Sequence, residues 1–144
     1  PVTRAQMAVF LERGMRGSTF VPPPAKGNVF TDVAAGAFAA NFIEQLYLDG
    51  ITAGCGANKY CPDGLIGRAE MAVFLLRAKH GASYRPPPAT GLFSDVPLNH
   101  WAVHWIEQLA REGITGGCGG GKYCPSAVVT RDQMAVFLVR TFGL

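Results

Sequence analysis

A chain of 144 residues can bury one substantial core or hold a few small repeats that share a core. Its hydrophobic fraction of 49% and charged fraction of 16% exclude a disordered chain. The net charge of +3 is mild and the basic residues are scattered, which excludes nucleic acid as a partner, and the apolar runs are too short for membrane insertion.

The chain repeats itself at a fixed period. Residues 30–81 align without a gap to residues 93–144, and residues 1–17 repeat only the last part of that unit. Residues 18–29 and 82–92 lie between the copies as linkers. Self-similarity of this kind marks a supersecondary unit that is used several times. We therefore expect a mainly α chain of tandem repeats, each formed by a helix, a glycine-rich loop and a second helix.

The opening half repeat predicts a helix that begins after Thr3. Thr3 and Gln6 fit the capping box, in which each side chain satisfies the free backbone N–H of the other residue. Met7, Phe10 and Leu11 give this helix an apolar face. Because the first half of the unit is missing from residues 1–17, we expect this face to lack its partner helix and to invite contact with a neighbouring chain.

Two proline runs separate the repeats. Residues 21–24 and 85–88 each contain three consecutive prolines. Such runs favour an extended polyproline II spacer of about 3 Å per residue. We interpret them as semi-rigid linkers that hold successive repeats apart, and not as ligands of proline-binding domains.

The first helix of each full repeat is predicted by apolar residues at helical spacing. These residues are Phe38, Phe42, Ile43 and Leu46 in one repeat, and Trp101, Trp105, Ile106 and Leu109 in the other. Gly50 and Gly113 follow, where a left-handed residue ends a helix at little steric cost. We expect Glu44 and Glu107 on the solvent side of these helices or in polar contacts between repeats.

A glycine-rich loop with two cysteines comes next in each full repeat. The Ile-Thr pairs at 51–52 and 114–115 are expected to form very short β segments before the loop. The cysteines form two local pairs, Cys55 with Cys61 and Cys118 with Cys124. An even number in a small, glycine-rich chain favours two disulfides in an oxidising exterior. The alternatives are free thiols or a four-cysteine zinc site, which would need shorter spacing and convergence of both loops.

The second helix of each full repeat begins after the cysteine loop. Thr130 and Gln133 form another capping box, whereas Gly67 and Glu70 form a weaker version without the threonine hydroxyl. The apolar residues that follow predict one buried face for each helix; they are Met71, Phe74, Leu75 and Ala78 in one copy, and Met134, Phe137 and Leu138 in the other.

Five sequence elements occur in the same order in both full repeats. F-x-D-V is followed by W-A-x-x-W-I or its counterpart, by G-I-T-x-G, by Y-C-P and by R-x-E/Q-M-A-V-F-L. This series resembles the S-layer homology repeat, and residues 1–13 match its C-terminal part. The resemblance implies a bacterial, exported protein whose repeats pack as a pseudo-symmetric bundle with grooves between them. The cysteine pairs depart from the general pattern of the family.

The resemblance also implies a ligand and a set of binding residues. The grooves would hold acidic cell-wall polysaccharide through Arg4, Arg68, Arg131, Asp32, Asp95 and Trp101, with Phe38 at the place of Trp101 in the other repeat. Each group has a structural alternative: the arginines can be solvated residues beside a capping box, the aspartates can form caps or turns, and Trp101 can be a core residue. The local pattern favours the structural alternative for the aspartates and for Trp101.

We therefore expect a non-catalytic extracellular module that anchors a protein to the bacterial cell envelope, with no cofactor. His100 and His104 have the spacing of a metal pair on a helix, but Ala37 and Asn41 replace them in the other repeat, so no metal is expected. The alternative is a structural subunit that assembles with identical subunits into an extracellular filament or surface layer. Such a polymer would complete its half repeat with a neighbouring chain.

Overall fold

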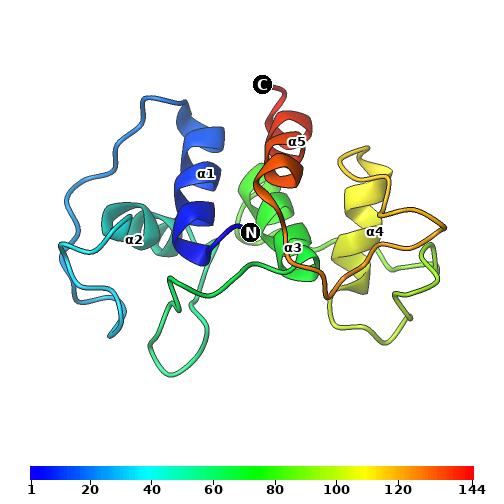
Figure 1. Ribbon diagram of the computed structural model, residues 1–144, viewed down its shortest axis with the longest axis horizontal. Helices are drawn as coiled ribbons and strands as arrows, with labels where there is room; N and C mark the ends of the chain where they lie inside the picture. Colours follow the sequence, from blue (N-terminus) through cyan, green and yellow to red (C-terminus); the bar gives the residue numbers. More distant parts are fainter.

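The computed structural model describes residues 1–144 as five helices joined by loops. The helices are α1 (Arg4–Arg16), α2 (Ala40–Leu48), α3 (Arg68–His80), α4 (Val103–Arg111) and α5 (Arg131–Phe142). Figure 1 shows α1, α3 and α5 in the middle of the molecule, with α2 beside α1 and α4 beside α3 on opposite sides. The fold is mainly α, as the repeat pattern predicted. None of the helices has both the length and the apolar character needed to cross a membrane.

The three central helices are related by a pseudo-threefold axis. Val2, Ile66 and Val129 precede them at the same position of the repeat and are fully buried. The N–H of Val2 donates to the carbonyl of Val129 (2.9 Å), that of Val129 to Ile66 (2.8 Å) and that of Ile66 to Val2 (3.0 Å). This cycle closes with three members, so two full repeats and a half repeat together form one closed bundle.

The helices that pack together come from different sequence repeats. α1 packs against α2 and α3 packs against α4, whereas α2 and α3, the two helices of one repeat, do not contact each other. A structural unit is therefore the second half of one repeat with the first half of the next. The expectation that α1 exposes its apolar face is wrong, because α1 packs against α2, α3 and α5, and Met7 and Leu11 are fully buried.

The helix without such a partner is α5, at the other end of the chain. Val136 and Val139 on α5 are 44% and 49% exposed. The residues at the same positions of α3 are Val73, which is 8% exposed, and Leu76, which is fully buried. The difference arises because α4 covers α3, whereas no helix of the chain packs against α5 at the matching place.

The helix starts follow the predicted capping chemistry. The Thr3 hydroxyl accepts from the Gln6 N–H (3.1 Å) and the Gln6 side chain accepts from the Thr3 N–H (3.0 Å). Thr130 and Gln133 form the same box on α5. On α3, Gly67 has no side chain to contribute, and Glu70 alone accepts from its N–H.

The Ile-Thr pairs after α2 and α4 are not β segments, which corrects the sequence expectation. Gly50 takes φ +76°, and this turns the chain so that the Ile51 N–H bonds back to the Leu46 carbonyl. The Ile114 N–H likewise bonds to Leu109, so both segments close the preceding helix. The β structure is limited to isolated bridges, two of them inside the cysteine loops.

Buried glutamates fix the linkers to the helices. Both carboxylate oxygens of Glu44 accept N–H groups, from Lys26 and Gly27 at 2.9 Å each. Glu107 does the same for the second linker, where it accepts the N–H groups of residues 90–92. Neither glutamate lies on the solvent side, because each carboxylate is needed to satisfy linker backbone that follows the prolines.

Candidate functional site

Two of the three motif arginines lie at junctions between repeats. Arg4 and Arg68 are the first residues of α1 and α3, and they are only 6% and 4% exposed. The structural alternative of a solvated arginine beside a capping box therefore does not apply to these two. They are buried because the cysteine loop of the next repeat folds over each of them, as the hydrogen bonds to Tyr60 and Tyr123 demonstrate.

A tyrosine clasps each buried arginine. The Nε of Arg4 donates to the Tyr60 carbonyl (2.7 Å), and the Tyr60 hydroxyl donates to the Arg4 carbonyl (2.8 Å). Arg68 and Tyr123 repeat both bonds at 2.8 Å. Burial raises the pKa of both phenols above the ordinary value, although the arginines oppose the change, so the hydroxyls remain donors near neutral pH.

Each buried arginine still has unused donors. The Nη2 atoms of Arg4 and Arg68 are buried without a hydrogen-bond partner. A guanidinium has five N–H donors in a fixed fork that matches the oxygens of a carboxylate. A buried, permanently charged group with free donors beside a cavity is suited to charge-assisted binding of an oxyanion.

The two arginines line two equivalent cavities. The first, which we call the α3 groove, has a volume of about 310 Å³ and is lined by Arg4, Thr52, Glu70, Arg77, Trp101 and Trp105, among others. The second, the α5 groove, has a volume of about 270 Å³ and is lined by Arg68, Thr115, Gln133 and Arg140, among others. Every polar residue of the second list occupies the repeat position of a residue in the first list. The repeat thus builds the same type of groove twice.

The grooves differ in their aromatic wall. Trp101 and Trp105 come from the first half of the repeat that follows α3, and they close one side of the α3 groove. No aromatic residue of the chain stands at the matching side of the α5 groove. The α3 groove is therefore the one that contains elements from all three copies of the repeat.

Trp101 lies outside the core, which corrects the structural alternative favoured by the helical spacing. It is 64% exposed, and Phe38 at the same position of the other repeat is 70% exposed. The helices begin later, at Val103 and Ala40, so both aromatic residues lie in the turns before them. Trp101 lines the α3 groove, whereas Phe38 lines neither groove.

Arg131 has a different environment from the other two arginines. It is exposed, and its guanidinium lies 5.7 Å from the centre of the Phe10 ring on α1. Arg4 and Arg68 lie over the corresponding Phe74 and Phe137 at 5.8 and 5.6 Å, so the third arginine keeps the pseudo-threefold position. It has no tyrosine clasp, because no cysteine loop of the chain covers the start of α5.

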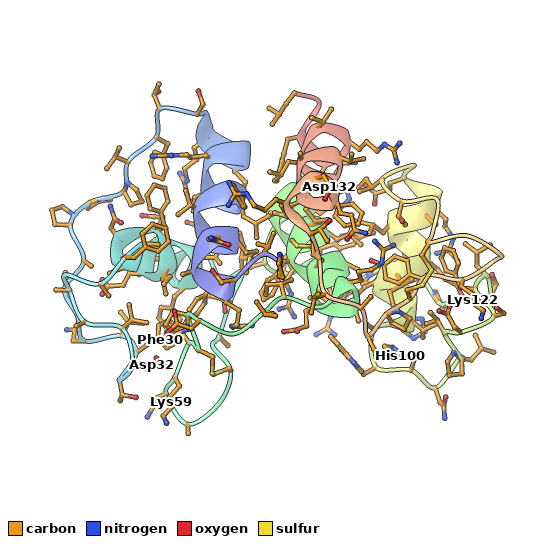
Figure 2. The ribbon with its side chains drawn as sticks, viewed as in Figure 1. Phe30, Asp32, Lys59, His100, Lys122 and Asp132 are labelled. Carbon is orange, nitrogen blue, oxygen red and sulfur yellow. A yellow bond between two sulfur atoms is a disulfide. The ribbon has the colours of Figure 1, made fainter.

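The aspartates hold the cysteine loops. The two carboxylate oxygens of Asp32 accept the N–H groups of Tyr60 and Cys61 at 2.8 Å each, and Asp95 does the same for Tyr123 and Cys124. Burial raises the pKa of each carboxyl, but these bonds outweigh it and keep both pKa values below the ordinary range. In Figure 2, Asp32 lies near Lys59 of the first cysteine loop, and Lys122 lies on the matching loop at the opposite end of the molecule.

Disulfides lock the same loops. Cys55 is bonded to Cys61 and Cys118 to Cys124, as predicted, so neither free thiols nor a zinc site is formed. Gly54 takes φ +102°, and a Cβ there would lie 2.4 Å from the Lys59 carbonyl oxygen, so the close turn requires glycine. Three features thus fix the loops that carry Tyr60 and Tyr123: a disulfide, hydrogen bonds to an aspartate carboxylate and a close turn that requires glycine.

The histidine pair does not form the arrangement that its spacing allowed. His100 lies before α4, because the helix begins at Val103. The Nδ1 of His100 accepts the Ala102 N–H (3.0 Å) and the Nδ1 of His104 accepts the Ala89 N–H (2.8 Å). Both rings support local backbone.

Four site residues were missed by the sequence reasoning. They are Tyr60 and Tyr123, which clasp the arginines, and Arg77 and Arg140, which line the grooves. A signal for them exists, since both pairs are identical between repeats, in Y-C-P and in the arginine that follows F-L-L or F-L-V.

The fold and the grooves define a repeat module whose inter-repeat cavities combine arginine with aromatic residues. Comparison with known protein families identifies the family of this module. The sequence model of the S-layer homology domain matches residues 29–72 and 92–135. The chain belongs to the S-layer homology domain family.

Three relatives illustrate where such modules occur. A cell surface protein of Thermoanaerobacter kivui is 34% identical over 79% of this chain and 15% of its own length. The S-layer protein EA1 of Bacillus anthracis is 29% identical over 72% of the chain and 12% of its length. The exoglucanase XynX of Acetivibrio thermocellus is 29% identical over 95% of the chain and 12% of its length.

The chain thus spans less than a sixth of these relatives, and the match covers a cell-surface anchoring module and not the catalytic part of the glucanase. This family places the chain outside the cell, at the envelope. The two disulfides agree with an oxidising exterior.

Proposed function

We propose that this module anchors its protein to the cell envelope by binding acidic cell-wall polysaccharide in the grooves between repeats. The observation that carries the proposal is the pair of buried arginines, Arg4 and Arg68, whose Nη2 atoms lack a partner beside a cavity. A guanidinium held in place by a tyrosine clasp loses little side-chain entropy when it binds a carboxylate.

Trp101 adds a surface for a sugar ring. It is exposed and lines the α3 groove together with Arg4. Aromatic faces bind apolar sugar faces by dispersion and apolar burial, while the arginine supplies charge. Asp32 and Asp95 act indirectly in this proposal, because both of their oxygens already accept loop N–H groups. Arg131 is a weaker candidate, since nothing holds its exposed side chain against a loop.

Retention on purified cell-wall polymer tests the proposal. Arg4→Ala together with Arg68→Ala should abolish retention in low salt, and circular dichroism would show whether the double variant folds. Trp101→Ala removes an exposed side chain and should weaken retention without unfolding the protein. Phe38→Ala is the matched control, because Phe38 has the same repeat position and exposure but lines neither groove. Equal retention of the natural sequence, the double arginine variant, Trp101→Ala and Phe38→Ala would overturn the proposal.

We propose self-assembly as a second function, on the exposed apolar face of α5 formed by Val136 and Val139. Within residues 1–144, α2 packs against α1 and α4 packs against α3, and no third helix of that type packs against α5. In this proposal the exposed face of α5 packs against α5 of a second copy, and Val139→Glu should prevent the association. Monodisperse monomers in analytical ultracentrifugation and electron microscopy would exclude this function.

A further inference from the structure

The two grooves carry different charges because one residue of the repeat differs. Glu70 lines the α3 groove and Gln133 lines the α5 groove, each as the third residue of its helix. Both side chains fold back to cap the helix: Glu70 accepts the Gly67 N–H (3.3 Å) and Gln133 accepts the Thr130 N–H (3.1 Å). Since glutamine performs the capping role as well as glutamate, capping does not require the charge of Glu70.

The charge of Glu70 is directed at the groove arginine. Its second oxygen lies 3.3 Å from Nη1 of Arg4 and forms an ion pair. No carboxylate of the chain forms an ion pair with Arg68, and the Nη1 of Arg68 makes no hydrogen bond. An incoming anion must therefore compete with Glu70 for Arg4, whereas no carboxylate competes for Arg68.

The second arginine of each groove does not remove this difference. Arg77 in the α3 groove and Arg140 in the α5 groove occupy the same repeat position, and neither forms an ion pair. The α3 groove thus combines two cations with one carboxylate and two tryptophans, and the α5 groove combines two cations with no acidic residue.

We propose that the two grooves divide the recognition of one polymer: the α5 groove binds the oxyanion group through Arg68 and Arg140, and the α3 groove, where Glu70 engages Arg4, binds a neutral sugar ring on Trp101. Glu70 is then a specificity-determining residue, and its replacement by glutamine converts the α3 groove into an anion site. The inference rests on the proposed function, since it assigns parts of the same ligand to the two grooves.

Titration with sodium glucuronate, followed by NMR of the arginine Nε–H signals, measures each groove separately. The 144-residue protein provides these signals, because the Nε–H groups of Arg4 and Arg68 are held in hydrogen bonds to Tyr60 and Tyr123. Arg68 should respond at a concentration about two- to fivefold lower than Arg4, the range expected when a half-exposed ion pair is absent. N-acetylglucosamine, which is neutral, should perturb the indole N–H of Trp101 and leave the Arg68 signal unchanged.

Reciprocal variants assign the difference to the charge. Glu70→Gln should bring the response of Arg4 to the concentration at which Arg68 responds, and Gln133→Glu should weaken the response of Arg68 by a similar factor. Gln6→Glu is the matched control, because it makes the same change on α1, away from both grooves, and should alter neither response. Glu70→Gln and Gln133→Glu each keep a side chain that can cap the helix, so the temperature of thermal unfolding should change little.

Equal glucuronate affinity at Arg4 and Arg68 in the natural sequence would overturn the inference, as would an unchanged Arg4 response in Glu70→Gln or the absence of any response at both arginines. Retention on cell-wall polymer is scored separately on the same proteins. If the polymer retains the protein but the grooves show equal affinity, only the division of labour fails. If glucuronate distinguishes the grooves but the polymer does not retain the protein, the anchoring function fails instead.

Discussion

Tyr60 and Arg4 bond to each other twice across the junction of two repeats. The tyrosine hydroxyl donates to the arginine carbonyl, and the arginine Nε donates to the tyrosine carbonyl, at 2.8 and 2.7 Å. The guanidinium also lies 4.7 Å from the centre of the Tyr60 ring. One residue pair therefore joins the cysteine loop to the next helix of the bundle and aims a cation at a groove, so stability and ligand binding share the same contact.

Tyr60→Phe should destabilise the protein by about 1 to 3 kcal/mol, because it leaves the buried Arg4 carbonyl without its hydroxyl donor. Urea unfolding followed by circular dichroism measures the change. Tyr47→Phe is the matched control: the hydroxyl of this half-exposed tyrosine makes no hydrogen bond, and its loss should cost less than about 0.5 kcal/mol. Similar unfolding free energies for the two variants would contradict the clasp.

Acid should weaken the cysteine loops through Asp32 and Asp95. Burial raises their pKa, but hydrogen bonds from the loop N–H groups outweigh it, so both folded pKa values lie below those of the unfolded chain. Between the two values the unfolded chain binds more protons, and stability falls as the pH falls below about 4. Asp32→Asn should reduce the slope of unfolding free energy against pH in that range.

Asp63→Asn serves as the control for this pH dependence, since the Asp63 carboxylate accepts no hydrogen bond although it lies in the same loop region. Its acid slope should match that of the natural sequence. A slope that is equally steep in Asp32→Asn would rule out the loop clamp as its source.

Glu12 should have the opposite effect, at neutral to mildly alkaline pH. Burial raises the pKa of the Glu12 carboxyl from 4.5 to about 8; the neighbouring Asp49 carboxylate acts in the same direction, and Arg16 opposes both. Between these values the folded chain binds more protons than the unfolded chain, so stability decreases as the pH rises from about 4.5 to 8 and then levels off. Thermal unfolding over this range measures the decrease.

Leu76 occupies the position of Glu12 on α3 and is fully buried, which provides the test variant. Glu12→Leu should remove the decrease and stabilise the protein at pH 8 by on the order of 1 to 3 kcal/mol, because the Oε2 of Glu12 is buried without a partner. A pH profile that retains the decrease in Glu12→Leu would mean that another group titrates.

Much of the local structure could be predicted from sequence because its causes are local. Thr3 and Gln6 cap a helix through side chains three residues apart, and Cys55 and Cys61 are close enough along the chain to pair. Because the repeats share these motifs, each local prediction is supported by two copies of the same sequence pattern. The family resemblance also rests on contiguous motifs, and it led to the correct class of fold.

The pairing of helices could not be predicted, because the apolar faces carry no label for their partner. The apolar residues of α1 can pack against any amphipathic helix, and nothing in the local sequence specifies that α2 is the one that does so. The burial of Arg4 follows from this long-range choice. Trp101 was placed in the core for a different reason. The apolar residues keep helical spacing back to position 101, although α4 begins only at Val103, two residues later.

The exposed face of α5 makes the last prediction, in a comparison of equivalent positions. Leu76 on α3 lies under α4 and should cost about 2 to 5 kcal/mol when truncated to alanine. Val139 holds the same repeat position on α5 but is 49% exposed, so Val139→Ala should change the unfolding free energy by less than about 0.5 kcal/mol. Urea denaturation of both variants gives the difference directly. A large cost at Val139 in dilute protein would mean that another surface covers α5 in solution, and the cost should then depend on protein concentration, since only association with a second chain can supply that cover.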